Sequence, residues 1–273
     1  MSSAPAVIEK ERGFHDEWAD NIDYRSVKVY ETFLACTSPE PSWVLSHFGD
    51  LRGKRVLELG SGAGEAAVYF ALKGADVTAT DLSPRMLEVV QQVAIQHGVK
   101  LTTVVCSAED LSLFESESFD IVYAANTLHH VDIERCLDET KRVLKVDGVG
   151  GFWDPVAYNP AINVYRRMAT EVRTIDEHPL RRSDMKYFSD RFAVVGKRFF
   201  WLTSLLIFLK LYLIDRIHPN EDRYWKRIIS HESELRKWYK PLAAIDRVFL
   251  MLVPALGWWC WNIAIIVRKD RNK

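Results

Sequence analysis

The nine residues VLELGSGAG, 56–64, decide the fold of this chain. The run VLEL is short and apolar, which predicts a β-strand. Glycine then recurs at Gly60, Gly62 and Gly64, and a helical pattern begins at Glu65. Glycine tolerates left-handed backbone angles and lets the chain approach a ligand closely. The stretch therefore predicts a ligand-binding turn at the carboxyl end of the first strand of an open α/β sheet.

Strands and helices alternate around this turn. Such alternation, with helices of about ten residues, predicts a parallel, doubly wound sheet. Two later runs, 192–201 and 259–267, predict an antiparallel hairpin that completes a Rossmann-like α/β sheet of seven strands. We expect the other strands over 54–60, 76–81, 101–107, 119–126 and 149–153, and the main helices over 65–73, 84–97 and 133–145.

The length of 273 residues suits one large α/β domain. We expect an N-terminal helical cap segment over residues 1–53 and a ligand-binding core over 54–153. Residues 154–273 should supply further cap helices and the final strands of the same domain. Residues 1–12 are small and charged, and we expect them to be loosely held.

Composition excludes several classes of function. A formal net charge of −1 gives no electrostatic basis for nucleic-acid binding, so we expect no such partner. The four cysteines lie far apart, which predicts neither disulfides nor a zinc site, and we predict no metal. The first 20 residues lack a signal-peptide pattern, so we expect a cytoplasmic protein.

The spacing of the glycines discriminates between two nucleotide-type ligands. A dinucleotide fingerprint needs GxGxxG, but Glu65 stands where its third glycine would be. Asp81 follows Gly60 by 21 residues, where a carboxylate can accept hydrogen bonds from an unphosphorylated ribose. The alternative is an NAD(P)-dependent oxidoreductase, and Glu65 argues against it.

Five motifs occur in an order that resembles the class I S-adenosylmethionine-dependent methyltransferases, in particular the small-molecule group that includes the ubiquinone and menaquinone methyltransferases. They are VLELGSGAG, ATDLSPRML (79–87), SAEDL (107–111), SFDIVYAANTLHHV (118–131) and RVLKVDG (142–148). The resemblance implies methyl transfer from S-adenosylmethionine to a small molecule. Ser107 departs from the family, which usually has Asp before the alanine of the adenine loop.

The resemblance also implies the cofactor-binding residues. In the family, the glycine turn binds the methionine end of the cofactor. The second strand and the adenine loop bind the ribose and the adenine, and the end of the fourth strand lies near the sulfonium. These residues are Glu58, Gly60, Ser61, Gly62, Gly64, Asp81, Leu82, Met86, Ala108, Glu109 and Asn126.

His129 and His130 are the candidate catalytic residues, because the family places this loop beside the methyl group. A histidine has a pKa near the working pH and can deprotonate an acceptor. Two alternatives stay open: histidines that anchor the loop by packing, and a binding protein without catalysis. Only turnover separates the last alternative from an enzyme.

Arg166 and Arg173 are candidate substrate-binding residues in an arginine-rich segment, although a solvated helix face would give the same pattern. Aromatic residues before and after the core predict an apolar or amphiphilic acceptor, or else they fill a large cap core. These residues are Phe14, Trp18, Tyr24, Tyr30, Phe199, Phe200, Trp201 and the Leu-rich run to Ile214.

Residues 248–267 are long and apolar enough to span a bilayer. Pro254 and Gly257 interrupt the run, so we expect a short helix followed by a sheet strand instead. The apolar run 203–214 is too short to span, which leaves a peripheral membrane contact of the cytoplasmic protein open. The sequence does not predict the oligomeric state.

Overall fold

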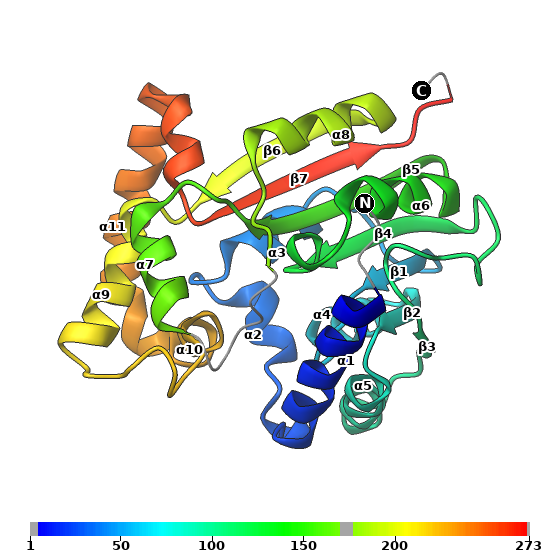
Figure 1. Ribbon diagram of the computed structural model, residues 1–273, viewed down its shortest axis with the longest axis horizontal. Helices are drawn as coiled ribbons and strands as arrows, with labels where there is room; N and C mark the ends of the chain where they lie inside the picture. Colours follow the sequence, from blue (N-terminus) through cyan, green and yellow to red (C-terminus); the bar gives the residue numbers. More distant parts are fainter. Residues whose placement is uncertain (1–4, 170–176, 272–273) are drawn as a thin grey trace.

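The computed structural model describes residues 5–169 and 177–271. Its sheet has seven strands in the order β3-β2-β1-β4-β5-β7-β6 (Figure 1). The first five strands pair in parallel, and β7 runs antiparallel to both β5 and β6. The predicted fold class is therefore confirmed. The strands are β1 (Arg55–Leu59), β2 (Asp76–Asp81), β3 (Thr102–Val105), β4 (Phe119–Ala125), β5 (Leu144–Pro155), β6 (Ala193–Phe200) and β7 (Asn262–Arg268).

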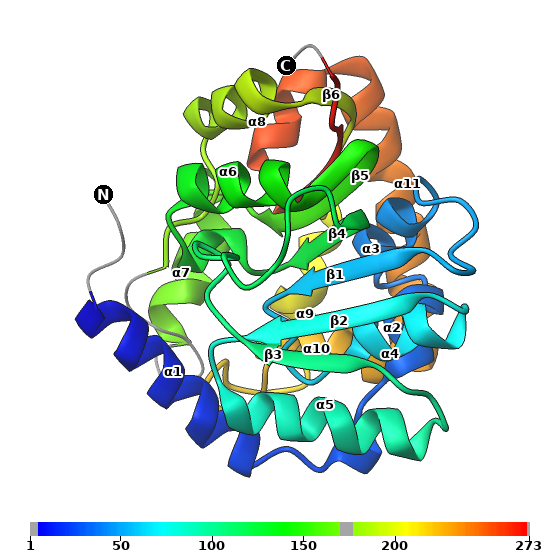
Figure 2. The ribbon, with the colours of Figure 1, turned by 90° about the vertical axis from the view of Figure 1, so that its right-hand side faces the viewer.

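Helices cover both faces of this sheet (Figure 2). Apolar side chains of α2 to α5 pack in one core cluster, and those of α6 and α8 pack in another with the opposite face of the central strands. The helices are α1 (Pro5–Asp20), α2 (Val29–Leu34), α3 (Pro39–Leu45), α4 (Glu65–Leu72), α5 (Pro84–Gln96), α6 (Ile133–Val143), α7 (Pro160–Met168), α8 (Met185–Arg191), α9 (Leu206–Leu213), α10 (Tyr224–Ser230) and α11 (Glu232–Leu252).

The N-terminal segment departs from the expectation of a loose end. α1 begins at Pro5 and packs along α5 (Figure 2). The carboxyl side chain of Glu11 is buried, and it lies 3.7 Å from Nε2 of His15. The expectation for residues 5–12 was wrong because they continue a helix that packs along α5 and buries Glu11, although Glu9, Lys10 and Arg12 stay exposed.

A long excursion, residues 201–261, joins the neighbouring strands β6 and β7 and contains α9, α10 and α11. Figure 1 shows α7, α9 and α10 gathered beyond the ends of β4 and β5. The run 248–267 divides between the end of α11, a 3-10 segment over Pro254–Trp259 and β7, as predicted from its proline and glycine. No helix in the described ranges is both long and apolar enough to cross a membrane.

Candidate active site

Three glycines shape the turn between β1 and α4. Gly60, Gly62 and Gly64 have φ angles of +63°, +51° and +86°, which residues with a side chain rarely adopt. A Cβ on Gly60 would lie 2.7 Å from Oγ1 of Thr127, whereas a Cβ on Gly62 would meet no described atom within 4 Å. Gly60 is thus needed for close packing against the loop after β4, and Gly62 leaves open space in front of the turn.

Asp81, at the end of β2, faces the same turn. Its Oδ2 accepts a hydrogen bond from the backbone N–H of Gly62 at 3.0 Å, and its Oδ1 accepts one from Ser83 at 3.0 Å. Burial raises the pKa of Asp81 to about 6, although both backbone bonds lower it. Each carboxylate oxygen has a second lone pair, so Asp81 can also accept hydrogen bonds from a ligand in the cavity that it lines.

Glu58 of β1 is a buried acid beside this turn. Its Oε2 has no hydrogen-bond partner among the described residues. Burial, followed by the charges of Glu65 and Asp81, raises the pKa of Glu58 well above its usual range. A buried acceptor without a donor costs free energy, so this carboxyl suits a ligand that brings an ammonium or an N–H group.

One carboxyl group organises the loop after β4. Asp154 accepts hydrogen bonds from the backbone N–H groups of Thr127, Leu128 and His129 at 3.4, 3.2 and 3.2 Å. Its Oδ1 also lies 2.5 Å from Nδ1 of His129. Asp154 is fully buried, and this burial raises its pKa to about 7. Because Asp154 engages Nδ1, the other ring nitrogen of His129, Nε2, lies on the side of the ring that faces Glu177 and the cavity.

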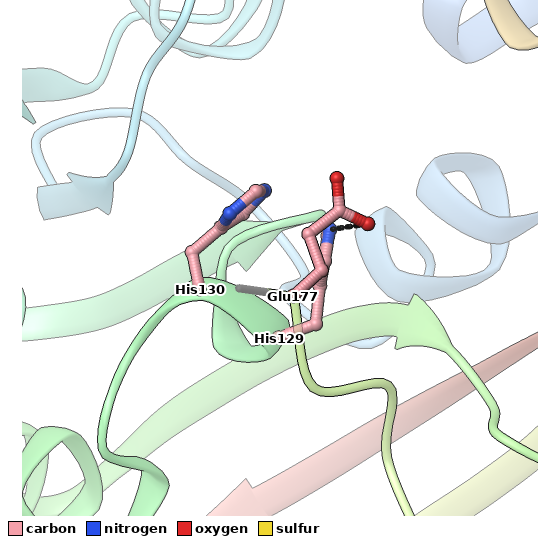
Figure 3. Close-up of side chains that lie close together, drawn as sticks. All are labelled: His129, His130 and Glu177. Carbon is pink, nitrogen blue, oxygen red and sulfur yellow. Dashed lines mark ion pairs between the residues drawn. The ribbon is translucent and has the colours of Figure 1, made fainter. Parts of the chain in front are cut away.

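His129, His130 and Glu177 converge from two separate segments (Figure 3). Nε2 of His129 lies 3.8 Å from Oε2 of Glu177, and Nδ1 of His130 lies 3.4 Å from Oε2 of Glu11. His129, His130 and Glu177 each offer one potential ligand atom, and these three atoms lie within 4.8 Å of one another. Two imidazoles and a carboxylate form a donor set that transition metals accept, so these are the described residues best placed to hold a metal.

Trp18 of α1 and the start of α10 cover the cavity together. Cζ of Arg223 lies 3.6 Å from the centroid of the Trp18 ring, and Nζ of Lys226 lies 4.8 Å from it. Lys226 also forms an ion pair with Glu65, with 3.2 Å between Nζ and Oε1. Arg223 has no carboxylate partner in the described ranges, and burial lowers its pKa to about 10. A desolvated cation without an acidic partner favours the binding of an anionic group nearby.

Behind this cover the cavity reaches an aromatic wall. Trp153 and Tyr165 contribute to the wall from β5 and α7, and Trp201 and Trp261 contribute from the two ends of the β6–β7 excursion. The cavity has a volume of about 280 Å³ and includes the glycine turn and Asp81. Space for a nucleoside-type ligand and space for an apolar molecule are therefore continuous.

A polar pair interrupts the aromatic wall. Nδ2 of Asn262 donates a hydrogen bond to Oε1 of Glu40 at 2.7 Å, and both side chains are buried and line the cavity. Oδ1 of Asn262 has no partner among the described residues. Burial raises the pKa of Glu40 to about 7. The pair therefore offers a hydrogen-bond acceptor to a ligand that reaches this wall.

Comparisons with known proteins agree with this geometry. A family model described as a methyltransferase domain matches residues 57–151, which include the turn, Asp81 and the histidine loop. An uncharacterized methyltransferase, YbaJ of Bacillus subtilis, is 37% identical over 116 residues, 41% of this chain and 45% of its own length. A ubiquinone biosynthesis O-methyltransferase of Photobacterium profundum is 38% identical over 90 residues, 33% of this chain and 38% of that protein.

The chain contains a methyltransferase domain over residues 57–151, and its sheet has the fold of solved methyltransferases. It spans less than half the length of these two curated relatives. Among solved structures, the YcgJ protein of Bacillus subtilis has a TM-score of 0.56 at 20% identity, over 84% of this chain and 97% of YcgJ. Geranyl diphosphate methyltransferase in complex with GPP and sinefungin has a TM-score of 0.57 at 17% identity, over 85% of this chain and 77% of that protein. These structures share the fold.

The structure brings most of the predicted site residues to one cavity. The predicted residues that line it are Glu58, Gly60, Ser61, Gly62, Asp81, Leu82, Ala108, Asn126, His129, His130 and Arg166. Their individual roles stay predictions. Arg173 lies outside the described residues.

Gly64, Met86 and Glu109 are not among the residues that line the cavity. Gly64 is the left-handed cap residue of α4, and Met86 is fully buried in the first turn of α5. The carboxylate of Glu109 turns away and accepts a hydrogen bond from the backbone N–H of Asp132 at 2.9 Å. Cofactor contact by these three residues stays a prediction.

The aromatic residues predicted for the acceptor side also divide into those that line the cavity and those that do not. Phe14, Trp18 and Trp201 line the cavity, whereas Tyr24, Tyr30, Phe199, Phe200 and the Leu-rich run do not. Sequence reasoning missed Glu11, His15, Glu40, Glu177, Arg223 and Asn262, which do line it. These residues lie in the N-terminal and C-terminal segments, far in sequence from the glycine turn. Only their proximity in the fold identifies them.

Proposed function

We propose that this methyltransferase transfers a methyl group from S-adenosylmethionine to a small, apolar or amphiphilic acceptor. The observation that carries the proposal is one cavity that joins the glycine turn and Asp81 to an aromatic wall. In this proposal residues 54–153 hold the cofactor. The segments 1–53 and 154–273 form the cap that covers it and receives the acceptor.

The residues present fit S-adenosylmethionine on two observations. The buried Oε2 of Glu58 has no donor within the described chain, which suits the ammonium group of the methionine moiety. Asp81 retains lone pairs directed at the cavity, which suit the two ribose hydroxyls. The open space in front of Gly62 lets the methionine chain approach the backbone.

S-adenosylmethionine supplies an electrophilic methyl group on a sulfonium, and the chain positions the acceptor for direct displacement. We assign the role of general base to Nε2 of His129, because Asp154 holds Nδ1 and fixes the ring. In this assignment Nε2 would accept the proton of the acceptor heteroatom while that atom bonds to the methyl carbon, the bond from this carbon to the sulfonium sulfur breaks, and S-adenosylhomocysteine is left. His130, whose Nδ1 lies beside Glu11, is the second candidate for the general base.

The aromatic wall supports an acceptor with an apolar body. Ligand pockets are mostly apolar with a few polar groups that fix orientation. Here Asn262, Arg166 and Arg223 are among the polar groups that line the cavity away from the glycine turn. The named activities of similar proteins, ubiquinone biosynthesis and geranyl diphosphate methylation, point to acceptors of this kind for this chain.

The test begins with binding and ends with turnover. We expect S-adenosylhomocysteine to raise the melting temperature of the protein, whereas NADH should leave it unchanged. Stabilisation by NADH alone would favour the oxidoreductase alternative. Incubation with S-adenosylmethionine carrying a labelled methyl group and a cell extract should then transfer the label to an organic-extractable product. Binding without any transfer would favour a non-catalytic binding protein.

A further inference from the structure

Arg223 is the one lysine or arginine of the cavity whose side chain has no hydrogen bond or ion pair within the described ranges. Lys226 forms an ion pair with Glu65, with 3.2 Å between Nζ and Oε1. Arg166 donates a hydrogen bond to Oδ1 of Asn163 at 3.0 Å. Burial lowers the pKa of Arg223 to about 10, so its guanidinium stays charged at neutral pH. A partly desolvated cation of this kind is costly until an anion binds to it.

Two aromatic side chains of α1 hold the guanidinium of Arg223. Its Cζ lies 3.6 Å from the centroid of the Trp18 ring and 5.8 Å from that of the Phe14 ring. Both rings line the same cavity. A guanidinium that lies over an aromatic face keeps its N–H donors in its own plane, where a carboxylate or a phosphate can accept two of them. The packing therefore orients the cation and leaves its donors for a ligand.

A row of rings leads from Arg223 to the proposed general base. The centroids of successive rings lie 5.7, 6.1 and 4.1 Å apart along Trp18, His15, His130 and His129, and all four side chains line the cavity. Burial, followed by the charge of His130, lowers the pKa of His15 to about 4, so His15 is neutral at pH 7. Arg223 and Nε2 of His129 are thus at opposite ends of this row.

The chain segment that carries Arg223 is the one that builds the acceptor side of the cavity. Arg223 belongs to the β6–β7 excursion, whose two ends supply Trp201 and Trp261 to the aromatic wall. The cofactor, in contrast, is assigned to residues 54–153. An anionic group on Arg223 would therefore lie next to an apolar body on the aromatic wall, which is the usual arrangement of a few polar anchors in a mostly apolar pocket.

We propose that Arg223 binds a carboxylate or phosphate group of the methyl acceptor, which makes this acceptor an anionic amphiphile. The inference rests on the proposed function and names its substrate class. The oxyanion accepts the in-plane N–H groups of the guanidinium, and the apolar body packs against the aromatic wall. The anionic group is not the one that receives the methyl group, because Arg223 and His129 are at opposite ends of the row of rings.

Three probes with the same apolar chain test the preference for charge: octanoate, octyl phosphate and octanol. Calorimetry on protein saturated with S-adenosylhomocysteine measures their affinities without any methyl transfer. We expect octanoate or octyl phosphate to bind at least about tenfold more tightly than octanol, because hydrogen bonds to charged groups are stronger than neutral ones. The tighter of the two acids identifies the group as a carboxylate or a phosphate.

Arg223→Gln should remove this preference and leave the affinity for octanol unchanged, because the amide carries no charge. Arg223→Lys keeps the charge but loses the planar fork, so we expect an intermediate preference. Arg198→Gln is the matched control. Cζ of Arg198 also lies over a ring, 5.2 Å from the centroid of Phe200, but Arg198 is not among the residues that line the cavity. This variant should bind all three probes like the parent.

The methionine part of the cofactor carries a carboxylate as well, so a second comparison separates the two sources of an oxyanion. Methylthioadenosine keeps the nucleoside and the thioether but lacks the amino-acid part. We expect Arg223→Gln to bind S-adenosylhomocysteine and methylthioadenosine with parental affinity, which also shows that its cavity is folded. Loss of affinity for S-adenosylhomocysteine alone would assign Arg223 to the cofactor carboxylate and overturn the inference.

Two further results would contradict an anionic acceptor bound by Arg223. One is equal binding of the three probes to the parent, and the other is a preference that survives in Arg223→Gln. If Arg223→Gln does not bind methylthioadenosine, Arg223→Lys decides, and a full preference in that variant would exclude the planar fork. A parent that shows the preference but transfers no methyl group would contradict the proposed function and leave the anion site intact.

Discussion

Nδ1 of His129 lies 2.5 Å from Oδ1 of Asp154, a carboxyl group without exposed surface. The same carboxyl accepts three backbone hydrogen bonds from the loop that carries His129. The histidine therefore has one orientation, with Nε2 toward the cavity. Asp154, a single buried acid, thus links the end of β5 to the loop that carries His129.

His129→Ala should lower kcat by about 100-fold or more, because general-base catalysis contributes 10²- to 10⁴-fold. The affinity for S-adenosylhomocysteine, measured by calorimetry, should stay within about twofold, since the ring does not hold the cofactor in this assignment. His47→Ala, a change of an exposed histidine, is the control and should have parental kinetics. A full-rate His129→Ala variant would show that the ring only anchors the loop.

The pH dependence of kcat provides a second test of the His129–Asp154 pair. Burial raises the pKa of Asp154 to about 7, and Oδ1 of this carboxyl contacts Nδ1 of His129. Catalysis needs the pair without its extra proton, so kcat should rise with pH through about 7 and then level off. A profile that falls over this range would contradict the role of a base.

Asp81→Ala should weaken binding of S-adenosylhomocysteine at least about tenfold, because charge-assisted hydrogen bonds contribute roughly 1.5–3 kcal/mol each. Calorimetry measures the loss directly. Asp76→Ala is the matched control, since Asp76 begins the same strand and is exposed at its far end. Equal affinity of Asp81→Ala and the parent would remove Asp81 from the ribose site.

Gly62→Ala separates backbone strain from loss of space for the ligand. Gly62 and Gly49 both have positive φ angles, +51° and +67°, and a Cβ would meet no described atom within 4 Å at either position. Both alanine variants should therefore lose about 1 kcal/mol of unfolding free energy. Only Gly62→Ala should also lower S-adenosylhomocysteine affinity, by tenfold or more. An equal effect of both variants on affinity would show that Gly62 does not face the ligand.

The sequence predicted the sheet because each strand and helix has a local period. Asp81 could be placed beside the glycine turn for the same reason: a short strand and a known spacing separate them. Periodicity could not show that Glu109 accepts a hydrogen bond from the backbone of Asp132, because that choice depends on the side-chain rotamer. It also could not show that the Leu-rich run lies outside the cavity.

The acceptor side of the cavity was beyond local patterns altogether. Glu40 and Asn262 meet at 2.7 Å although 222 positions separate them in the sequence. Trp18 and Arg223 meet in the same way, α1 against the start of α10. Such pairs follow from the arrangement of the N-terminal helices and the β6–β7 excursion around the sheet, which no spacing in either segment encodes.

Glu40 makes the stability of the ligand-free protein depend on pH. Burial raises the pKa of its carboxyl from an ordinary value of 4.5 to about 7 in the folded chain. Between these two values the folded chain binds a proton that the unfolded chain has released. The contribution to stability is therefore fully present below pH 4.5 and is lost as pH rises to about 7.

Glu40→Gln should remove this loss, because the amide stays neutral and its oxygen can still accept the hydrogen bond from Asn262. We expect the variant to match the parent near pH 5 and to exceed its unfolding free energy by about 1–3 kcal/mol at pH 8. Urea denaturation at both pH values measures the difference. Glu115→Gln, at an exposed position, should follow the parent at both. If Glu40→Gln is less stable than the parent at pH 8, the ionised carboxyl stabilises the folded chain, and a pKa of Glu40 raised by burial is wrong.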